Sequence, residues 1–346
     1  MPVESGQKIT AVAWNELTER LNKIFADKFP GSAPAQDMRV RNLQSYGWGQ
    51  VPSNVVTKGQ KFTAAIANDV IDKVKIGARQ VGSSYTLNNV TKGQKITALS
   101  INQISTVIDD IDPKRYTAAP NQLAFAFLGA TAKTTSWTQE VIFLGNLNFS
   151  NYDSARHYFN SGSSIKLTLS LANGNAASNV LNGLYERLGT VNVGLKDTTS
   201  STPNTPGEGK GFEHLNTTDW VKLIVLDLDN NGGYGYGYGY GGNNGYGYGY
   251  GNCNGYGYGY GYGYGGYGYG YGGYGYGYGG NCIGSVEIAG KIENGKVLVR
   301  TIVKTKSSSP KTGTHRVVYN TQKAIDKTSG EVNFHITPPT FAGSVS

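Results

Sequence analysis

Four histidines are the side chains of this chain that could most directly hold a metal ion or transfer a proton. They are widely separated in sequence, and no cysteine lies near any of them: His157, His214, His315 and His335. Metal-binding His and Cys residues usually recur at short, fixed spacings. The sequence also has no Gly-Lys-Ser or Gly-Lys-Thr loop that would cradle a phosphate group. We therefore expect no metal ion and no cofactor.

Acidic residues offer little more for catalysis. Asp227 and Asp229 flank the most unusual stretch of the chain and could form a cation site, but Asp at the exit of a strand is commonly a turn residue. A sugar-cleaving enzyme would need a pair of carboxylates in a groove, and no such pair stands out. The expectation is that this protein is not an enzyme.

The unusual stretch runs from Gly232 to Gly280 and consists of blocks in which Gly and Tyr alternate. It holds 18 of the 25 tyrosines and 26 of the 50 glycines, and no Lys, Arg, Asp or Glu. In an extended strand the alternation would place Tyr on one face and Gly on the other, whereas a three-residue helical turn would spread Tyr around the axis. The pattern therefore favours strands or hairpins, with turns at the Gly-Gly steps and Asn inserts.

Three interpretations of this Gly-Tyr tract stand: a disordered spacer, an ordered structural element with tyrosines stacked between chains, and a receptor-binding surface. Tyr supplies large, rigid, amphipathic contacts at low entropic cost. The candidate receptor or inter-subunit contacts are Tyr234, Tyr236, Tyr238, Tyr246, Tyr248, Tyr256, Tyr258, Tyr260, Tyr267, Tyr269, Tyr274 and Tyr276.

Both cysteines lie at the tract, Cys253 at an internal break and Cys282 at its far edge. A disulfide between them would clamp the insertion and would need an oxidising exterior. Two free thiols in a reduced protein are the other interpretation.

The 346 residues carry a formal charge of +8. The basic residues are scattered, and Arg300, Lys304 and Lys306 fall on alternate positions of one predicted strand, which indicates a solvated strand face and no nucleic-acid partner. The first residues lack the apolar core of a signal peptide, and no segment approaches the roughly 20 apolar residues of a membrane span. Synthesis in the cytoplasm without a membrane span is expected.

The first third of the chain contains three copies of one motif. They begin at Gly6, Gly59 and Gly93 and read Gly-Gln-Lys, then Ile or Phe, then Thr-Ala, with an Asn five residues after each Thr. Thr predicts a helix N-cap, and apolar residues follow at helical spacing. We expect the Asn side chains to satisfy backbone groups in a connection or between copies. The copies are 53 and 34 residues apart, which favours beads or a stalk over a uniform solenoid.

From about residue 116 the pattern changes to short strands. We predict three helical repeat modules over 1–115, a docking region, and an antiparallel β-sandwich-like domain over 116–346 with the Gly-Tyr insertion at 231–281. A helix is expected over Ala176–Leu188. The predicted strands are Gln139–Leu144, Ile165–Leu171, Thr190–Leu195, Val221–Asp227, Ser285–Ile292, Lys296–Val303, Thr314–Tyr319 and Glu331–Ile336.

The segment from Ser154 to Leu167, Ser-Ala-Arg-His-Tyr-Phe-Asn-Ser-Gly-Ser-Ser-Ile-Lys-Leu, resembles a signature of virion structural proteins of tailed bacteriophages. In that family Ala-Arg-x-Phe-Phe-Asn-x-Gly-Gly-x-Ile leads into a strand. Tyr158 and Ser163 are mild departures, and the Gly-Tyr insertion is a large one. The N-terminal copies also resemble helical modules of phage tail, neck and fibre proteins, and the tract is similar to Gly-rich tips of T-even-type fibre adhesins.

The resemblance implies a virion component of the tail, fibre or collar that takes part in assembly and host attachment. Its expected partners are other virion proteins through the N-terminal modules, further copies of itself with a trimer favoured, and a host surface glycan or protein. The alternative is a cellular surface or matrix protein with a cohesive Gly-Tyr tract.

Overall fold

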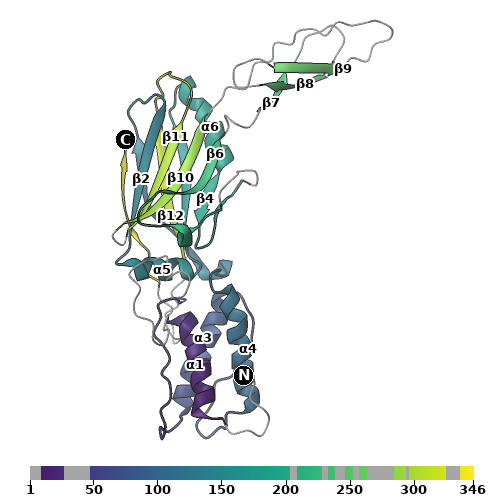
Figure 1. The fold of residues 1–346 in the computed structure, drawn as a ribbon, viewed down its shortest axis with the longest axis vertical. Helices are drawn as coiled ribbons and strands as arrows, with labels where there is room; N and C mark the ends of the chain where they lie inside the picture. Colours follow the sequence, from purple (N-terminus) through teal and green to yellow (C-terminus); the bar gives the residue numbers. More distant parts are fainter. Residues whose placement is uncertain are drawn as a thin grey trace.

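The computed structural model describes residues 9–26, 47–202, 209–227, 233–237, 246–251, 257–262, 284–293, 296–324 and 336–346. Figure 1 shows a helical bundle at one end of an elongated molecule, two β-sheets in the middle, and a small three-stranded sheet at the other end. Cys253, Cys282 and His335 lie outside the described residues, as does most of the predicted strand Glu331–Ile336.

Each motif copy starts a helix at the Thr that the sequence predicts. The side-chain oxygens of Thr10, Thr63 and Thr97 accept hydrogen bonds from backbone amides three residues later, at 3.2, 3.3 and 3.2 Å. Such caps satisfy donors that the first helical turn leaves without a partner. The helices that follow are α1 (Ala11–Phe25), α3 (Ala64–Gln80) and α4 (Ala98–Lys114).

In α1 and α3, the repeated Asn joins the helix to the segment that leads into the next one. Asn15 Nδ2 donates to the Val56 carbonyl at 2.9 Å, and the Val56 amide donates back to Asn15 Oδ1 at 2.8 Å. Asn68 makes the same pair of bonds with Val90, at 3.1 and 2.8 Å. The prediction that this Asn satisfies backbone groups between copies is confirmed for Asn15 and Asn68.

The three helices run parallel and share one core. Arg20 of α1 donates to Ser105 Oγ of α4 at 2.9 Å and also pairs with Asp109. The C-terminal ends of both helices meet Trp48, whose amide donates to the Ile24 carbonyl and whose Nε1 donates to the Arg115 carbonyl, so α1 and α4 point the same way. After α1 the chain returns beside the helix, because Gln50 bonds near its end and Val56 near its start. The helices therefore form one packed bundle and not separate beads, and all three begin at the end remote from the sheets (Figure 1).

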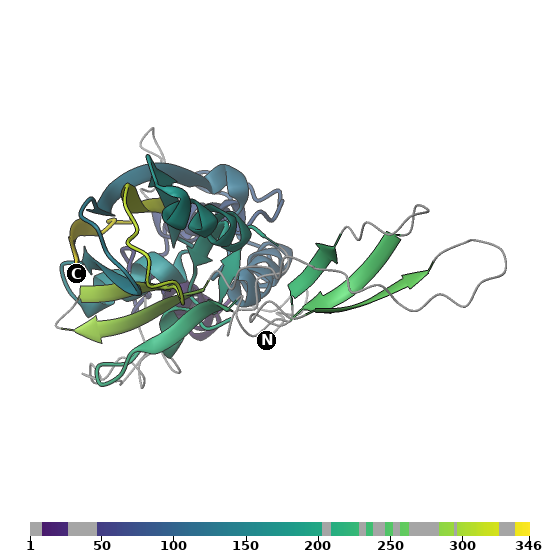
Figure 2. The ribbon, with the colours of Figure 1, turned by 90° about the horizontal axis from the view of Figure 1, so that it is seen from above.

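Two antiparallel five-stranded sheets follow the bundle. One has the order β1-β12-β3-β4-β5 and the other β13-β2-β11-β10-β6. The strands are β1 (Leu123–Lys133), β2 (Glu140–Asn148), β3 (Ser164–Ala172), β4 (Thr190–Val193), β5 (Thr198–Ser200), β6 (Val221–Asp227), β10 (Ser285–Glu293), β11 (Lys296–Lys304), β12 (Thr314–Ala324) and β13 (Thr340–Val345). Seen from above in Figure 2, the sheets form two layers. Their facing sides hold a core that includes Phe143, Leu167 and Tyr319.

Most of the predicted elements appear, with three strands and one helix added. Helix α6 spans Ala176–Leu188 as predicted, and the strands predicted before residue 320 lie within a residue or a few of the observed ones. The sequence did not reveal β1, β5, β13 or the helix α5 (Tyr152–Asn160). The prediction for Lys306 is wrong, because β11 ends at Lys304 and Lys306 lies in the following loop.

The segment that carries the phage-like signature forms the joint between the bundle and the sheets. Its first half is α5, capped by Asn151, whose Oδ1 accepts from the Ser154 amide at 2.8 Å. Trp48, only 1% exposed, inserts its indole so that Nε1 lies 3.0 Å from the carbonyl oxygens of both Arg115 and Asn160. One ring thereby ties α4 to α5.

Candidate functional site: the end that carries the Gly-Tyr insertion

The Gly-Tyr insertion leaves the molecule at the end opposite to the helices. Leu123 at the start of β1 pairs with Ala324 near the bundle, whereas Asp227 and Ser285, the residues that bracket the insertion, pair with each other at the far end. Because neighbouring strands lie about 4.8 Å apart, the two ends of the insertion are direct neighbours. The insertion is therefore the connection of one antiparallel strand pair, β6 and β10.

Gly284 is the residue at which the chain re-enters the sheet. Its φ of +129° is disfavoured for other residues, and a Cβ there would lie 1.9 Å from the Lys304 carbonyl oxygen. Only glycine fits between the returning chain and the end of β11.

Polar contacts close this end of the two sheets. Asn175, which caps α6, donates to the Pro310 carbonyl at 2.9 Å, and Ser178 Oγ donates to the Thr312 carbonyl at 2.7 Å. Lys311 is fully buried, and its ammonium donates to the carbonyls of Ser307 at 2.5 Å and Ser309 at 2.8 Å. Desolvation lowers the pKa of Lys311. These bonds hold the β11–β12 loop in one conformation beneath the insertion.

His315 lies in the same end of the core. Its side chain is only 1% exposed. The Nδ1 atom of His315 lies 3.0 Å from the Tyr185 hydroxyl oxygen, and the ring packs edge-on against Trp137 with ring centroids 5.1 Å apart. Burial lowers the pKa of His315, since the charged imidazolium loses its hydration. The His315 ring thus lies in edge-on contact with the rings of Trp137 and Tyr185 at this end.

Within the insertion, three strands form a separate antiparallel sheet in the order β7-β8-β9: β7 (Gly233–Gly237), β8 (Tyr246–Gly251) and β9 (Gly257–Tyr262). Tyrosine positions pair only with tyrosine positions and glycine with glycine. Tyr248 lies opposite Tyr236 on one side and Tyr260 on the other. These strands confirm that the alternation favours strands over a three-residue helix.

The structure brings half of the candidate tyrosines into this sheet: Tyr234, Tyr236, Tyr246, Tyr248, Tyr258 and Tyr260. The other six lie outside the described residues: Tyr238, Tyr256, Tyr267, Tyr269, Tyr274 and Tyr276. Tyr250 and Tyr262, which were not among the candidates, belong to the same ladders. The sequence signal that would have found them is the same alternation.

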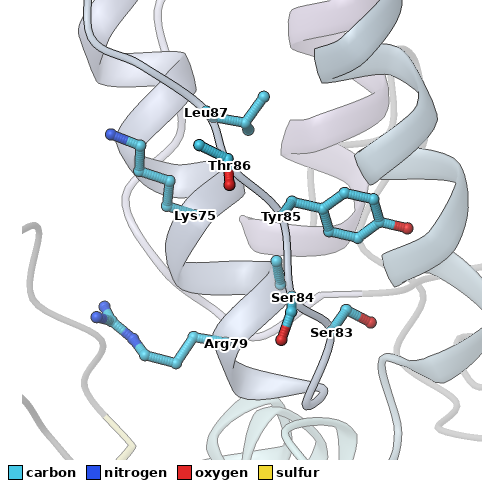
Figure 3. Close-up of a pocket in the computed structure, with 8 residues that line it drawn as sticks. Lys75, Arg79, Ser83, Ser84, Tyr85, Thr86 and Leu87 are labelled. Atoms are coloured by element: carbon cyan, nitrogen blue, oxygen red, sulfur yellow. The ribbon is translucent and has the colours of Figure 1, made fainter.

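A shallow pocket lies on the bundle, far from the insertion. It has a volume of about 320 Å³ and is lined by α3 and by the segment after it, including Lys75, Arg79 and Tyr85 (Figure 3). The Lys75 ammonium donates a hydrogen bond to Asn89 Oδ1 and lies 3.8 Å from Asp72 Oδ1. No carboxylate or histidine lines this pocket, so its residues offer no acid–base pair.

The described residues contain no cluster of three His, Cys, Asp or Glu side chains that could hold a metal ion. Within the same part of the chain, no helix is both long and apolar enough to cross a bilayer. His157 lies in the joint, and His214 ends a short 3₁₀ turn, so the described histidines are not brought together. Comparisons with protein-family models, curated proteins and solved structures each found no match.

Proposed function

We propose that this chain is a structural protein of a bacteriophage virion, a tail, fibre or collar component that the helical bundle attaches to the particle and that displays the Gly-Tyr insertion for adhesion to a host surface. The single observation that carries the proposal is the placement of the bundle and the insertion at opposite ends of the two sheets. An attachment region at one end and a display region at the other suit a protein that connects a phage particle to a host surface.

The likeness of the Ser154–Leu167 segment to the phage signature supports the proposal, because this segment forms the joint that couples the two regions. A buried tryptophan, Trp48, is hydrogen-bonded to both sides of this joint. In this proposal the chain works as an oligomer, with a trimer favoured, and without catalysis. Host surface glycans or proteins are the proposed receptors.

Particle association and adsorption test the two halves separately. Immuno-electron microscopy with an antibody to this chain should label particles, and absence of the label would contradict the virion assignment. For adhesion, residues 228–283 are replaced by Asn-Gly, which leaves a three-residue turn with the native Gly284 between the paired Asp227 and Ser285. Particles with this variant should assemble but adsorb poorly.

A cellular surface or matrix role is the second candidate. The Tyr-opposite-Tyr register supports it, because identical ladders can also pair between chains. In that case the purified protein would self-associate through the tract while particles remained unlabelled.

A further inference from the structure

The end of the bundle remote from the sheets carries two copies of one pentapeptide, Thr-Lys-Gly-Gln-Lys, at 57–61 and 91–95. Both copies form the same turn. The amide of Gln60 donates to the Thr57 carbonyl and that of Gln94 to the Thr91 carbonyl, each at 3.0 Å, and the intervening glycines have φ of +84° and +86°. We name the surface formed by these two turns and the first turns of α1, α3 and α4 the basic tip.

The lysines of the basic tip are not used to hold the bundle together. Lys58, Lys61, Lys92 and Lys95 are exposed, and none forms an ion pair within the described part of the chain. Lysines further along the helices do form pairs, for example Lys73 with Asp69 at 2.9 Å. The positive charge is therefore concentrated where it has no internal partner.

This charge distribution costs stability. Acidic residues favour the first turn of a helix, where lysines are unfavourable, yet the first turns of α1, α3 and α4 contain no acidic residue. Four like charges at one end also repel one another. An external partner that supplies negative charge accounts for both features.

Apolar side chains are interspersed with these lysines. Val12 and Leu99 occupy equivalent positions in the first turns of α1 and α4 and are 67% and 68% exposed. Phe62, between the second lysine of its turn and the cap of α3, is 40% exposed and packs edge-on against Trp14. Protein interfaces combine apolar contacts at their centre with a polar rim, and the exposed Val12, Leu99 and Phe62 would supply such contacts among the lysines. Phosphate binding depends on Lys and Arg and needs no aliphatic contacts.

We infer that the basic tip docks onto a carboxylate-rich surface of another protein. This inference rests on the proposed function, in which the bundle is the attachment end, and it names the surface and the chemistry of the partner. A tip-to-tip contact between two copies of the chain does not fit, because two basic tips repel. The Gly-Tyr tract does not fit either, since it has no Asp or Glu.

The test compares two variants that lose the same charge. In the tip variant, Lys58, Lys61, Lys92 and Lys95 are replaced by Gln. In the control, Lys196, Lys291, Lys296 and Arg316 of the two-sheet region, which form no ion pair within the described part of the chain, are replaced by Gln. Poly-L-glutamate is the acidic probe and a DNA duplex of equal charge the alternative. The full-length protein should bind poly-L-glutamate, more weakly as salt rises from about 50 to about 300 mM.

The tip variant should bind poly-L-glutamate about tenfold more weakly, and the control should stay within about twofold of the unaltered protein. Equal losses in both variants, or no binding by the unaltered protein, would overturn the docking surface. Tighter binding to the duplex would overturn the protein partner. A further variant, Leu99→Ser with Val12→Ser, should weaken incorporation into particles without changing binding to poly-L-glutamate.

Particle incorporation separates this inference from the proposed function. If the unaltered chain is absent from particles, the virion role fails while the poly-L-glutamate result is judged alone. If unaltered and tip variants enter particles equally, the docking inference fails and the virion role remains.

Discussion

The helical bundle and the Gly-Tyr insertion are both repetitive, but their repeats specify structure to different degrees. A bundle repeat combines a turn glycine, a Thr that caps the helix, an Asn that bonds to the neighbouring segment, and apolar residues that face the core. Each of these residues makes its own contact; Asn15 bonds to Val56, for example, and Asn68 to Val90. An insertion repeat contains only Gly and Tyr. A strand that slips by two residues there recovers the same Tyr-opposite-Tyr pairing, so composition sets the kind of pairing and not a single register.

The largest expected effect is at the joint, where one side chain is irreplaceable. Trp48→Ala should lower the free energy of unfolding by about 4 kcal/mol, because it removes a fully buried ring and leaves two carbonyls without their donor. Denaturant unfolding measures this. Trp48→Phe keeps most of the apolar contact and should lose less; equal losses would show that the hydrogen bonds, and not the ring, hold the joint.

A smaller decrease in the free energy of unfolding is expected when Asn68 loses its bonds to Val90. Asn68→Ala removes both bonds to Val90 and should cost about 1 to 2 kcal/mol. The exposed Gln103→Ala on α4 is the matched control and should stay within about 0.5 kcal/mol of the unaltered protein. If Asn68→Ala behaved like the control, the bundle repeat would be no more specific than the Gly-Tyr repeat.

The sheets beneath the insertion should respond to pH through His315. Its pKa is lowered in the folded protein, so the unfolded chain binds the proton more readily. The contribution to stability is complete above about pH 6.5, the ordinary His value, and is lost as pH falls through the folded pKa. His315→Gln should flatten the pH dependence of the unfolding free energy between neutral and acidic pH; an unchanged slope would assign it to other groups.

The smallest effect is expected inside the insertion. Deleting the pair Tyr260-Gly261 from β9 should change the thermal unfolding of the sheets by less than the equivalent of about 0.5 kcal/mol, because the shortened strand re-forms an equivalent register and loop closure depends weakly on length. Calorimetry checks this. A clear loss of stability would mean that the insertion has a unique register coupled to β6 and β10.

Local signals in the sequence predicted much of this fold. The Thr caps and α6 are set by neighbouring residues, and β6, β10 and β11 have alternating apolar runs. Strand β1 was not predicted because its large apolar residues face solvent and its other positions hold small residues. Phe125 and Phe127 are 62% and 63% exposed, and the strand has a bulge between Phe127 and Gly129.

Other features depend on contacts that are distant in sequence. The parallel direction of α1 and α4 follows from Trp48, whose amide bonds to Ile24 at the end of α1 and whose indole bonds to Arg115 at the end of α4, contacts that repeat spacing alone does not specify. The role of Trp48 depends on carbonyls 67 and 112 residues away. For the candidate site, the alternation predicted strands correctly, but the placement of the bundle and the insertion at opposite ends became visible only from the register of the sheets.

The pairing of Asp227 with Ser285 makes the length of the insertion independent of the body that carries it. A strand gains about 3.3 Å in length for each residue, so one Gly-Tyr unit added to each strand of the β7-β8-β9 sheet would lengthen that sheet by about 7 Å. Gain or loss of DNA repeats that each encode one Gly-Tyr dipeptide would therefore change the length of the tract by two residues at a time. Strands β6 and β10 would keep their pairing.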